Sequence, residues 1–262
     1  ISAVMALGSK QIAATLPMMI LLYEWYFFRQ LDWGWLKDNI RRFIVPLAVF
    51  AVVALVYLGF DPLDRIVAGY DRRDFTMGQR VLTQFRVVVF YLSLIFYPHP
   101  SRLSLDHDFS LSSSLIDPVS TIFSLFALVG AIGFAAFNAR RLPLISFCIL
   151  WFFGNLVIES SVIGLEIIFE HRTYLPSMFL TLAIISGIEK MVRWEKGRFV
   201  AVVLLAVLLT FFTIERNTVW ANRVKLWEDC VKKAPQKARP HHNLGLALEN
   251  ANRMVEAERQ YR

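Results

Sequence analysis

The chain has 262 residues, with 28 Lys and Arg against 21 Asp and Glu, and a formal net charge of +7. Only 19% of its residues are charged and 56% are hydrophobic, whereas soluble domains are about a quarter charged. This composition argues against an ordinary soluble domain, and it excludes disorder because so many apolar side chains cannot stay solvated. Two cysteines exclude a disulfide framework, and Cys148 and Cys230 are not expected to pair.

A transmembrane helix needs about 20 mostly apolar residues, since each residue advances it by ~1.5 Å through a hydrocarbon core ~30 Å thick. Several stretches bounded by charges or proline approach this length. They lack the alternating pattern of barrel strands, and backbone groups in lipid must be satisfied within each segment. The sequence therefore predicts an all-α, polytopic transmembrane helix bundle. The predicted spans are residues 11–28, 43–60, 119–137, 142–158, 174–188 and 199–214.

A further apolar and aromatic stretch, residues 81–97, is ambiguous because Gln84 and Arg86 lie near its start. Cytoplasmic loops carry an excess of Lys and Arg. If residues 81–97 do not cross, the basic residues of the short loops all fall on one side, so we predict a re-entrant or interfacial helix here. Those basic residues are Arg29, Lys37, Arg41, Arg42, Arg140, Arg141, Lys190, Arg193, Lys196 and Arg198.

This topology places four polar features on the outer side of the membrane. They are the turn at residues 9–11, the region 61–118, the loop 159–173 and everything after residue 214. A site built from these loops would face away from the cytoplasm. Residues 1–214 are accordingly predicted to form one transmembrane domain and residues 215–262 a second region.

The second region has the spacing of a tetratricopeptide repeat (TPR), in which small and bulky residues let two antiparallel helices approach closely. We predict one nearly complete repeat at 238–262 and a partial unit at 219–235 that ends at Pro235. Repeats bury their faces only by stacking, so we expect further repeats beyond Arg262, and the chain to be part of a longer protein. The residues that carry the pattern are Leu244, Gly245, Leu248, Ala257 and Tyr261.

The densest polar cluster lies in the string EHRTYLPS, at the mouth of a predicted span. Ionisable groups at a membrane edge are costly unless they are paired, so the cluster suggests a functional site. The alternative is an interfacial anchor, in which Arg172 reaches the head groups and Tyr174 joins an aromatic belt. An anchor does not need a Glu-His-Arg run, which favours function, and the guanidinium fork suits a phosphate. The cluster consists of Glu166, Glu170, His171, Arg172 and Tyr174.

A second cluster, Asp106, His107 and Asp108, lies in the predicted outer region. Carboxylates and an imidazole can bind a divalent metal or act as acid and base. In an extended segment, however, the two aspartates share one face and His107 takes the other, which weakens the metal interpretation. A substrate or structural hydrogen-bonding role and a plain solvated loop remain open.

Lys10 and Glu159 lie near the ends of apolar stretches, where Lys10 could meet an anionic head group or simply snorkel to the interface. His241 and His242 are adjacent on a helix and therefore point in different directions, which suggests surface or packing roles. The sequence has no phosphate-binding glycine loop and no CxxC, HExxH or GxSxG motif. The positive charge belongs mainly to the predicted cytoplasmic loops, so nucleic-acid binding has no support.

Four segments together resemble a known family: SKQIAATLP, LTQFRVVVFYLSLIFYPHPSRLSLDHDF, EHRTYLPS and the LW…P-x-x-A-R-x-x-x-NLG entry into the repeats. They are similar to bacterial polytopic membrane proteins with C-terminal TPRs, which in turn resemble TMTC-type O-mannosyltransferases of the GT-C glycosyltransferase class. The sequence departs from this pattern at Gln11, where the family usually has Glu. The family's acidic catalytic residue would lie upstream of Ile1, so the resemblance assigns no catalytic base to this chain.

The resemblance implies a polyprenyl-phosphate-linked sugar, such as mannose, transferred to a protein hydroxyl outside the cytoplasm. Lys10 and Arg172 are then candidate phosphate contacts, with Glu170, His171 and Tyr174 as supports. The expected partners are membrane lipids, the lipid-linked sugar and a protein acceptor held by the TPRs; no cofactor is implied and a metal is not favoured. The expected location is the bacterial inner membrane, with periplasmic TPRs. The alternative is a non-enzymatic TPR scaffold for envelope assembly.

Overall fold

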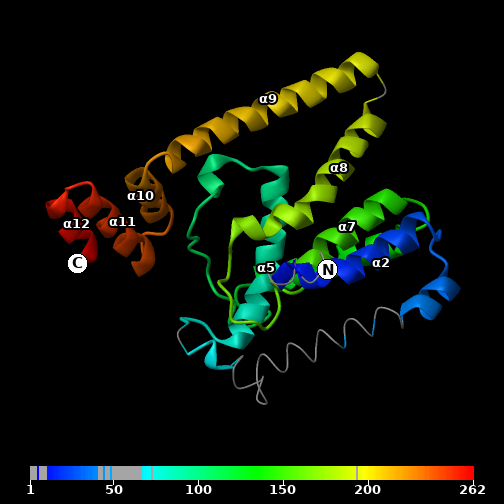
Figure 1. Cartoon of the computed structure of the whole chain (residues 1–262), viewed down its shortest axis with the longest axis horizontal. Coiled ribbons are helices and arrows are strands. Elements are labelled where there is room, and N and C mark those ends of the chain that lie inside the picture. The colour runs from blue at the N-terminus through cyan, green and yellow to red at the C-terminus, as the bar shows by residue number, and fades with distance from the viewer. Residues whose placement is uncertain are drawn as a thin grey trace. The chain divides into compact units, whose positions relative to one another are not determined.

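The computed structural model describes residues 11–40, 67–71, 73–192 and 194–262, together with Met5, Ile44 and Ala48. This part of the chain is helical and contains no strand, as the composition predicted. Lys10 lies outside the described residues, as does the predicted span at residues 43–60 apart from Ile44 and Ala48. The elements, shown in Figure 1, are η1 (Gln11–Thr15), α2 (Leu16–Phe27), α5 (Met77–Phe96), η2 (Pro100–Arg102), α6 (Ser120–Asn138), α7 (Pro143–Leu156), η3 (Glu170–Thr173), α8 (Tyr174–Met191), α9 (Glu195–Trp220), α10 (Arg223–Lys233), α11 (Ala238–Asn250) and α12 (Met254–Tyr261).

Among the described residues, three helices are long and apolar enough to cross a membrane: α5, α6 and α9. The helix α9 contains the predicted span 199–214, and α6 covers the predicted span 119–137 except its first residue. The shorter apolar helix α7 covers most of the predicted span 142–158. The helix α5 covers residues 81–96 of the ambiguous stretch and also meets the length and composition of a span. Its re-entrant or interfacial placement therefore stays a prediction.

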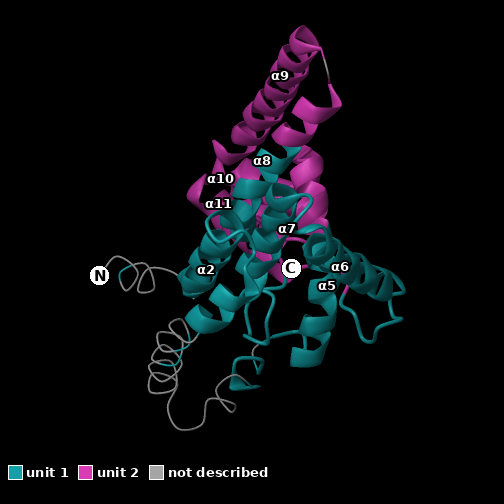
Figure 2. Cartoon of the chain, turned by 90° about the vertical axis from the view of Figure 1, so that its right-hand side faces the viewer, with its two compact units in different colours: residues 1–89, 111–167, 172–184 teal, residues 90–110, 168–171, 185–262 magenta. Residues whose placement is uncertain are grey.

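The chain divides into two compact units, coloured separately in Figure 2. Unit 1 comprises residues 1–89, 111–167 and 172–184, and unit 2 comprises residues 90–110, 168–171 and 185–262. Both units combine segments that are distant in the sequence. They are defined by contacts within the chain, so the sequence-based boundary at residue 214 remains a prediction.

In unit 1, α2 and α7 lie side by side (Figure 1) and are joined by polar as well as apolar contacts. The Tyr26 and Ser146 hydroxyls are 2.7 Å apart, and the Thr15 hydroxyl donates to Asn155 Oδ1 at 2.8 Å. Gly154 permits close approach, because a Cβ there would lie 2.5 Å from Met19 Cε. Small residues and interhelical hydrogen bonds are the usual means of helix association where lipid removes the hydrophobic driving force.

In unit 2, α10, α11 and α12 pack as successive antiparallel helices around a small apolar core. Asn222 caps α10, since its side-chain oxygen accepts from Val224 N at 2.8 Å. Gly245 of α11 lies against the Tyr261 ring, where a Cβ would be 2.3 Å from Cε1. This arrangement is compatible with a TPR. The buried core residues are Val224, Leu244, Ala247, Leu248 and Ala257.

Candidate functional site

The first polar group, in unit 1, centres on a buried ion pair between Arg172 and Glu159. Arg172 Nε lies 2.9 Å from Glu159 Oε2, and the two side chains are 5% and 6% exposed. Arg172 Nη1 also donates to the Glu166 carbonyl oxygen at 2.7 Å. Removing charges from water is costly, so such a pair persists only with good geometry and additional hydrogen bonds. Arg172 thus holds the 159–166 loop from within.

Arg80 of α5 is a second buried cation that contacts the same loop. The sequence analysis did not identify it as a site residue. Its side chain is fully buried and donates to the carbonyl oxygens of Glu159 at 2.7 Å and of Leu165 at 3.0 Å, and to that of Ser161. One turn further along α5, Gln84 Nε2 donates to the Ile167 carbonyl at 2.9 Å. The i, i+4 spacing of Arg80 and Gln84 on an apolar helix was the available signal, because it places both on one helix face.

Further contacts fix the same loop from the segment that precedes α5. Arg73 forms an ion pair with the Glu166 carboxylate, and the Tyr70 hydroxyl donates to the Val162 carbonyl at 2.7 Å. Loops usually expose their backbone to water, whereas here side chains satisfy the carbonyls of the 159–167 loop. The loop is therefore ordered by side-chain hydrogen bonds rather than being a solvated connection.

The second polar group, in unit 2, gathers around the Glu170 carboxylate. His107 Nε2 lies 2.8 Å from Glu170 Oε1, and the Ser104 backbone N–H donates to the same oxygen at 2.6 Å. Their side chains are 11% exposed for His107 and 27% for Glu170. The Tyr91 hydroxyl binds the Phe169 backbone, accepting from its N–H at 2.9 Å. The structure thus brings together two of the predicted site residues, His107 and Glu170.

Asp106 belongs to a different set of contacts in unit 2. Its side chain is 3% exposed and lies 2.6 Å from Arg239 Nε and 3.2 Å from Lys237 Nζ. Burial raises the pKa of this carboxyl, but the hydrogen bonds and charges of Arg239 and Lys237 outweigh burial and leave the pKa below its ordinary value. Asp106 is therefore a buried carboxylate that pairs with two cations. This burial rules out the solvated loop that the sequence had left as one alternative for Asp106.

The other predicted site residues that the structure describes are exposed. His171 and Asp108 are exposed, and the Tyr174 side chain is 85% exposed. The His171 ring stacks on Phe169, with centroids 5.2 Å apart. These three side chains can be reached by a ligand, whereas Arg172 and Asp106 cannot without rearrangement of their ion pairs.

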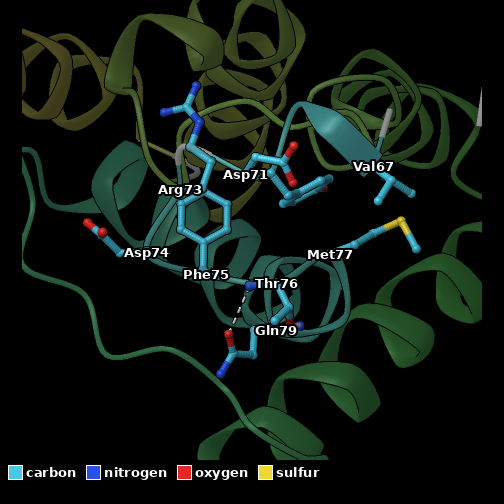
Figure 3. A pocket seen from close by; sticks show the side chains of 9 residues that line it. Val67, Asp71, Arg73, Asp74, Phe75, Thr76, Met77 and Gln79 are labelled. Carbon is cyan, nitrogen blue, oxygen red and sulfur yellow. Dashed lines mark hydrogen bonds between the residues drawn. The ribbon is translucent and has the colours of Figure 1, made fainter. Parts of the chain in front are cut away.

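Two other features of the described residues hold none of the predicted site residues. A cavity of about 590 Å³ in unit 1 is lined by residues that include Asp71, Asp74 and Phe75, whose side chains are drawn in Figure 3. His241 is engaged in packing, since Nδ1 lies 2.8 Å from Gln260 Oε1 and Nε2 lies 3.1 Å from the Pro235 carbonyl. Within the described part of the chain, no group of three or more His, Cys, Asp or Glu residues is placed to hold a metal.

Comparisons with known proteins relate part of this chain to an O-mannosyltransferase. The chain is 29% identical over 101 residues to human Protein O-mannosyl-transferase TMTC1 and 27% identical over 101 residues to the mouse protein. The match covers 37% of this chain, but only 12% of the human and 11% of the mouse protein. No protein-family model and no solved structure matches the chain. With three helices among its described residues long and apolar enough to cross a bilayer, the chain is a membrane protein that resembles TMTC1 over part of its length.

Proposed function

We propose that this chain is part of an integral-membrane glycosyltransferase that moves a sugar such as mannose from a polyprenyl-phosphate donor to a protein hydroxyl outside the cytoplasm. The observation that carries the proposal is the similarity to TMTC1, a protein named for O-mannosyl transfer. Support comes from the loop that the buried Arg80 and Arg172 organise, and from helices that are long and apolar enough to cross a membrane. The GT-C class and a bacterial inner-membrane location are part of the same proposal.

In this proposal, accessible and buried residues have different roles. The exposed His171 and Tyr174 are each proposed as a contact for the donor, and Lys10 and Asp108 remain the further candidates from the sequence. Glu170 and His107 form a hydrogen-bonded pair whose carboxylate is partly exposed. Arg172 is 5% exposed on its side chain and engaged by Glu159, so it holds the loop at residues 159–166 in place. Asp106 positions the neighbouring loop.

The transfer itself breaks one bond and forms another. A base takes the proton of the acceptor hydroxyl, and the hydroxyl oxygen attacks the anomeric carbon. The bond from that carbon to the phosphate oxygen breaks, and the phosphate leaves with the electron pair, stabilised by nearby positive charge. Direct attack inverts the anomeric centre. No residue of this chain is assigned as the base.

The α10–α12 region is proposed to hold the protein acceptor. A groove of about 480 Å³ crosses these helices, with Leu244 and Leu248 at its floor. Charged residues of both signs line the same groove, among them Glu228, Lys232 and Arg259. An apolar floor with a charged rim suits a polypeptide segment.

The test is transfer of radiolabelled sugar in membranes that contain the full-length protein, with polyprenyl-phosphate mannose as donor. We expect His171→Ala and Tyr174→Ala each to lower transfer at least tenfold without lowering the amount of folded protein. Tyr23, which is 45% exposed on α2, provides the matched control, and Tyr23→Ala should retain transfer.

The non-enzymatic scaffold makes the opposite prediction. If the wild-type membranes transfer no sugar, or if Glu170, His171 and Arg172 can be replaced together with no loss beyond folding, the enzymatic proposal is wrong. The region would then serve as an anchor for a partner-binding α10–α12 region.

A further inference from the structure

Two neighbouring residues in unit 2 reach partners in different parts of that unit. Asp106 forms ion pairs with Lys237 and Arg239, at the start of α11. His107 binds the Glu170 carboxylate at 2.8 Å. Successive side chains of an extended segment point to opposite sides, so one short segment can hold both partners at once. We name residues 103–108 the bridging segment.

The backbone of the bridging segment is also attached to α10, which forms a helical hairpin with α11. Lys233 of α10 donates to the carbonyl oxygens of Leu103 at 2.7 Å and Pro100 at 3.0 Å. Ser104 strengthens the local turn, because its hydroxyl donates to the Asp106 carbonyl at 2.7 Å. Three cations from α10, α11 and the loop between them therefore hold the segment from the hairpin side.

The same segment holds Glu170 from its other side. The Ser104 N–H and His107 Nε2 both contact Glu170 Oε1. A shift of the bridging segment therefore changes the surroundings of this carboxylate oxygen directly. Asp106 is almost fully buried and pairs with both cations, so losing its charge removes both ion pairs and weakens the attachment of the segment.

We propose that Asp106 is a positioning residue that couples the α10–α11 hairpin to the Glu170 carboxylate through the bridging segment. Movement of Lys237 and Arg239 is transmitted by Asp106 to His107, and by His107 to Glu170. The functional consequence rests on the proposed function: binding of a protein acceptor to the hairpin changes the position of the Glu170 carboxylate. Asp106 touches no substrate in this scheme.

A structural test uses nitroxide labels in the full-length protein in lipid nanodiscs. Asp108→Cys reports on the bridging segment and His171→Cys reports on the Glu170 side, since both positions are exposed while native Cys148 and Cys230 are fully buried. We expect Asp106→Asn and Arg239→Gln each to raise label mobility at both positions. The double variant should do no more than Asp106→Asn alone, because that change already removes the contact to Arg239.

Two controls separate coupling from general loosening. Arg239→Lys keeps the charge and should retain most of the wild-type immobility. Arg259→Gln removes a cation of α12 that lines the groove, and it should leave both labels unchanged. A rise confined to residue 108 overturns the coupling, and no rise at either position overturns the attachment itself.

A second experiment measures whether the coupling between the hairpin and Glu170 affects the rate of sugar transfer. In labelled-sugar assays, Asp106→Asn and Arg239→Gln should lower kcat at least tenfold and change the donor KM less than twofold. Unchanged kcat together with raised mobility at both labels overturns the role in catalysis. If the wild-type protein transfers no sugar, the proposed function fails, while the two labels still decide whether the hairpin is coupled to Glu170.

Discussion

Arg172 and Glu159 form an ion pair of 2.9 Å whose side chains are 5% and 6% exposed. The two residues come from opposite ends of the loop that follows α7 and leads into α8. The pair therefore joins the two ends of this loop and fixes the EHRTYLPS segment, which contains Arg172, to the start of the loop. Arg80 and Arg73 hold the intervening backbone and Glu166, so three arginines act on one loop.

Removing one partner of this pair should destabilise unit 1. Breaking a buried ion pair leaves an uncompensated charge and costs about 3–5 kcal/mol. We expect Arg172→Ala to lower the apparent melting temperature of the detergent-solubilised protein markedly. Exposed Arg140 provides the control, and Arg140→Ala should change the melting temperature little. An Arg172→Ala protein as stable as wild type would contradict the importance of the pair.

The α11–α12 contact should not tolerate a side chain at position 245. A Cβ there would lie 2.3 Å from Tyr261 Cε1, so Gly245→Ala must displace the Tyr261 ring. We expect a loss of about 1–3 kcal/mol, read as roughly five- to hundredfold faster amide hydrogen exchange in α12. Tyr261→Ala removes the obstructing ring, so adding Gly245→Ala to that variant should have little further effect.

Packing at Gly154 should matter more than the hydrogen bond at the neighbouring residue. Interhelical hydrogen bonds in membranes average about 0.6 kcal/mol, so Asn155→Leu, which removes the Thr15 hydrogen bond, should lower stability only slightly. Gly154→Leu places a bulky group where Met19 Cε already lies 2.5 Å from the Cβ position and should separate α2 from α7. Steric trapping in bicelles can measure both variants, and equal effects would contradict this order.

Attachment of the bridging segment should depend on pH in the acid range. The pKa of Asp106 is lower in the folded protein than its ordinary value, because Arg239 and Lys237 outweigh the effect of burial. Because the folded pKa is lowered, the ionised Asp106 stabilises the attachment fully above the unfolded pKa of about 3.9. This stabilisation is lost as the pH falls through the folded pKa. A nitroxide at residue 108 should therefore be immobile at neutral pH and gain mobility below about pH 4. The Asp106→Asn variant should lack this transition.

The predicted membrane topology can be tested with engineered cysteines. Native Cys230 is a poor reporter for the C-terminal region because it is fully buried. Lys225 on α10 and Arg140 after α6 are exposed. A membrane-impermeant maleimide should label Lys225→Cys without opening the membrane that holds the protein, and Arg140→Cys only after that membrane is opened. The reverse pattern would place α10–α12 in the cytoplasm.

Elements with a strong local signal were predictable from the sequence. The runs around 119–137 and 199–214 predicted the helices that appear as α6 and α9, because length and hydropathy alone make a segment able to span lipid. The spacing of Gly245 and Tyr261 predicted that two helices approach closely there. The alternation of Asp106 and His107 predicted that they face different ways, and their partners differ accordingly.

The identity of those partners was decided only by tertiary structure. Asp106 binds Arg239, 133 residues further along the chain, and Arg80 binds backbone carbonyls about 80 residues away. Periodicity defines which face of a helix or extended segment a side chain occupies, but long-range pairing depends on how several helices pack at once. The sequence by itself therefore determined an all-helical membrane protein and the residues with unusual chemistry. The tertiary structure decided that Arg172 and Asp106 are buried in ion pairs while His171 and Tyr174 remain exposed.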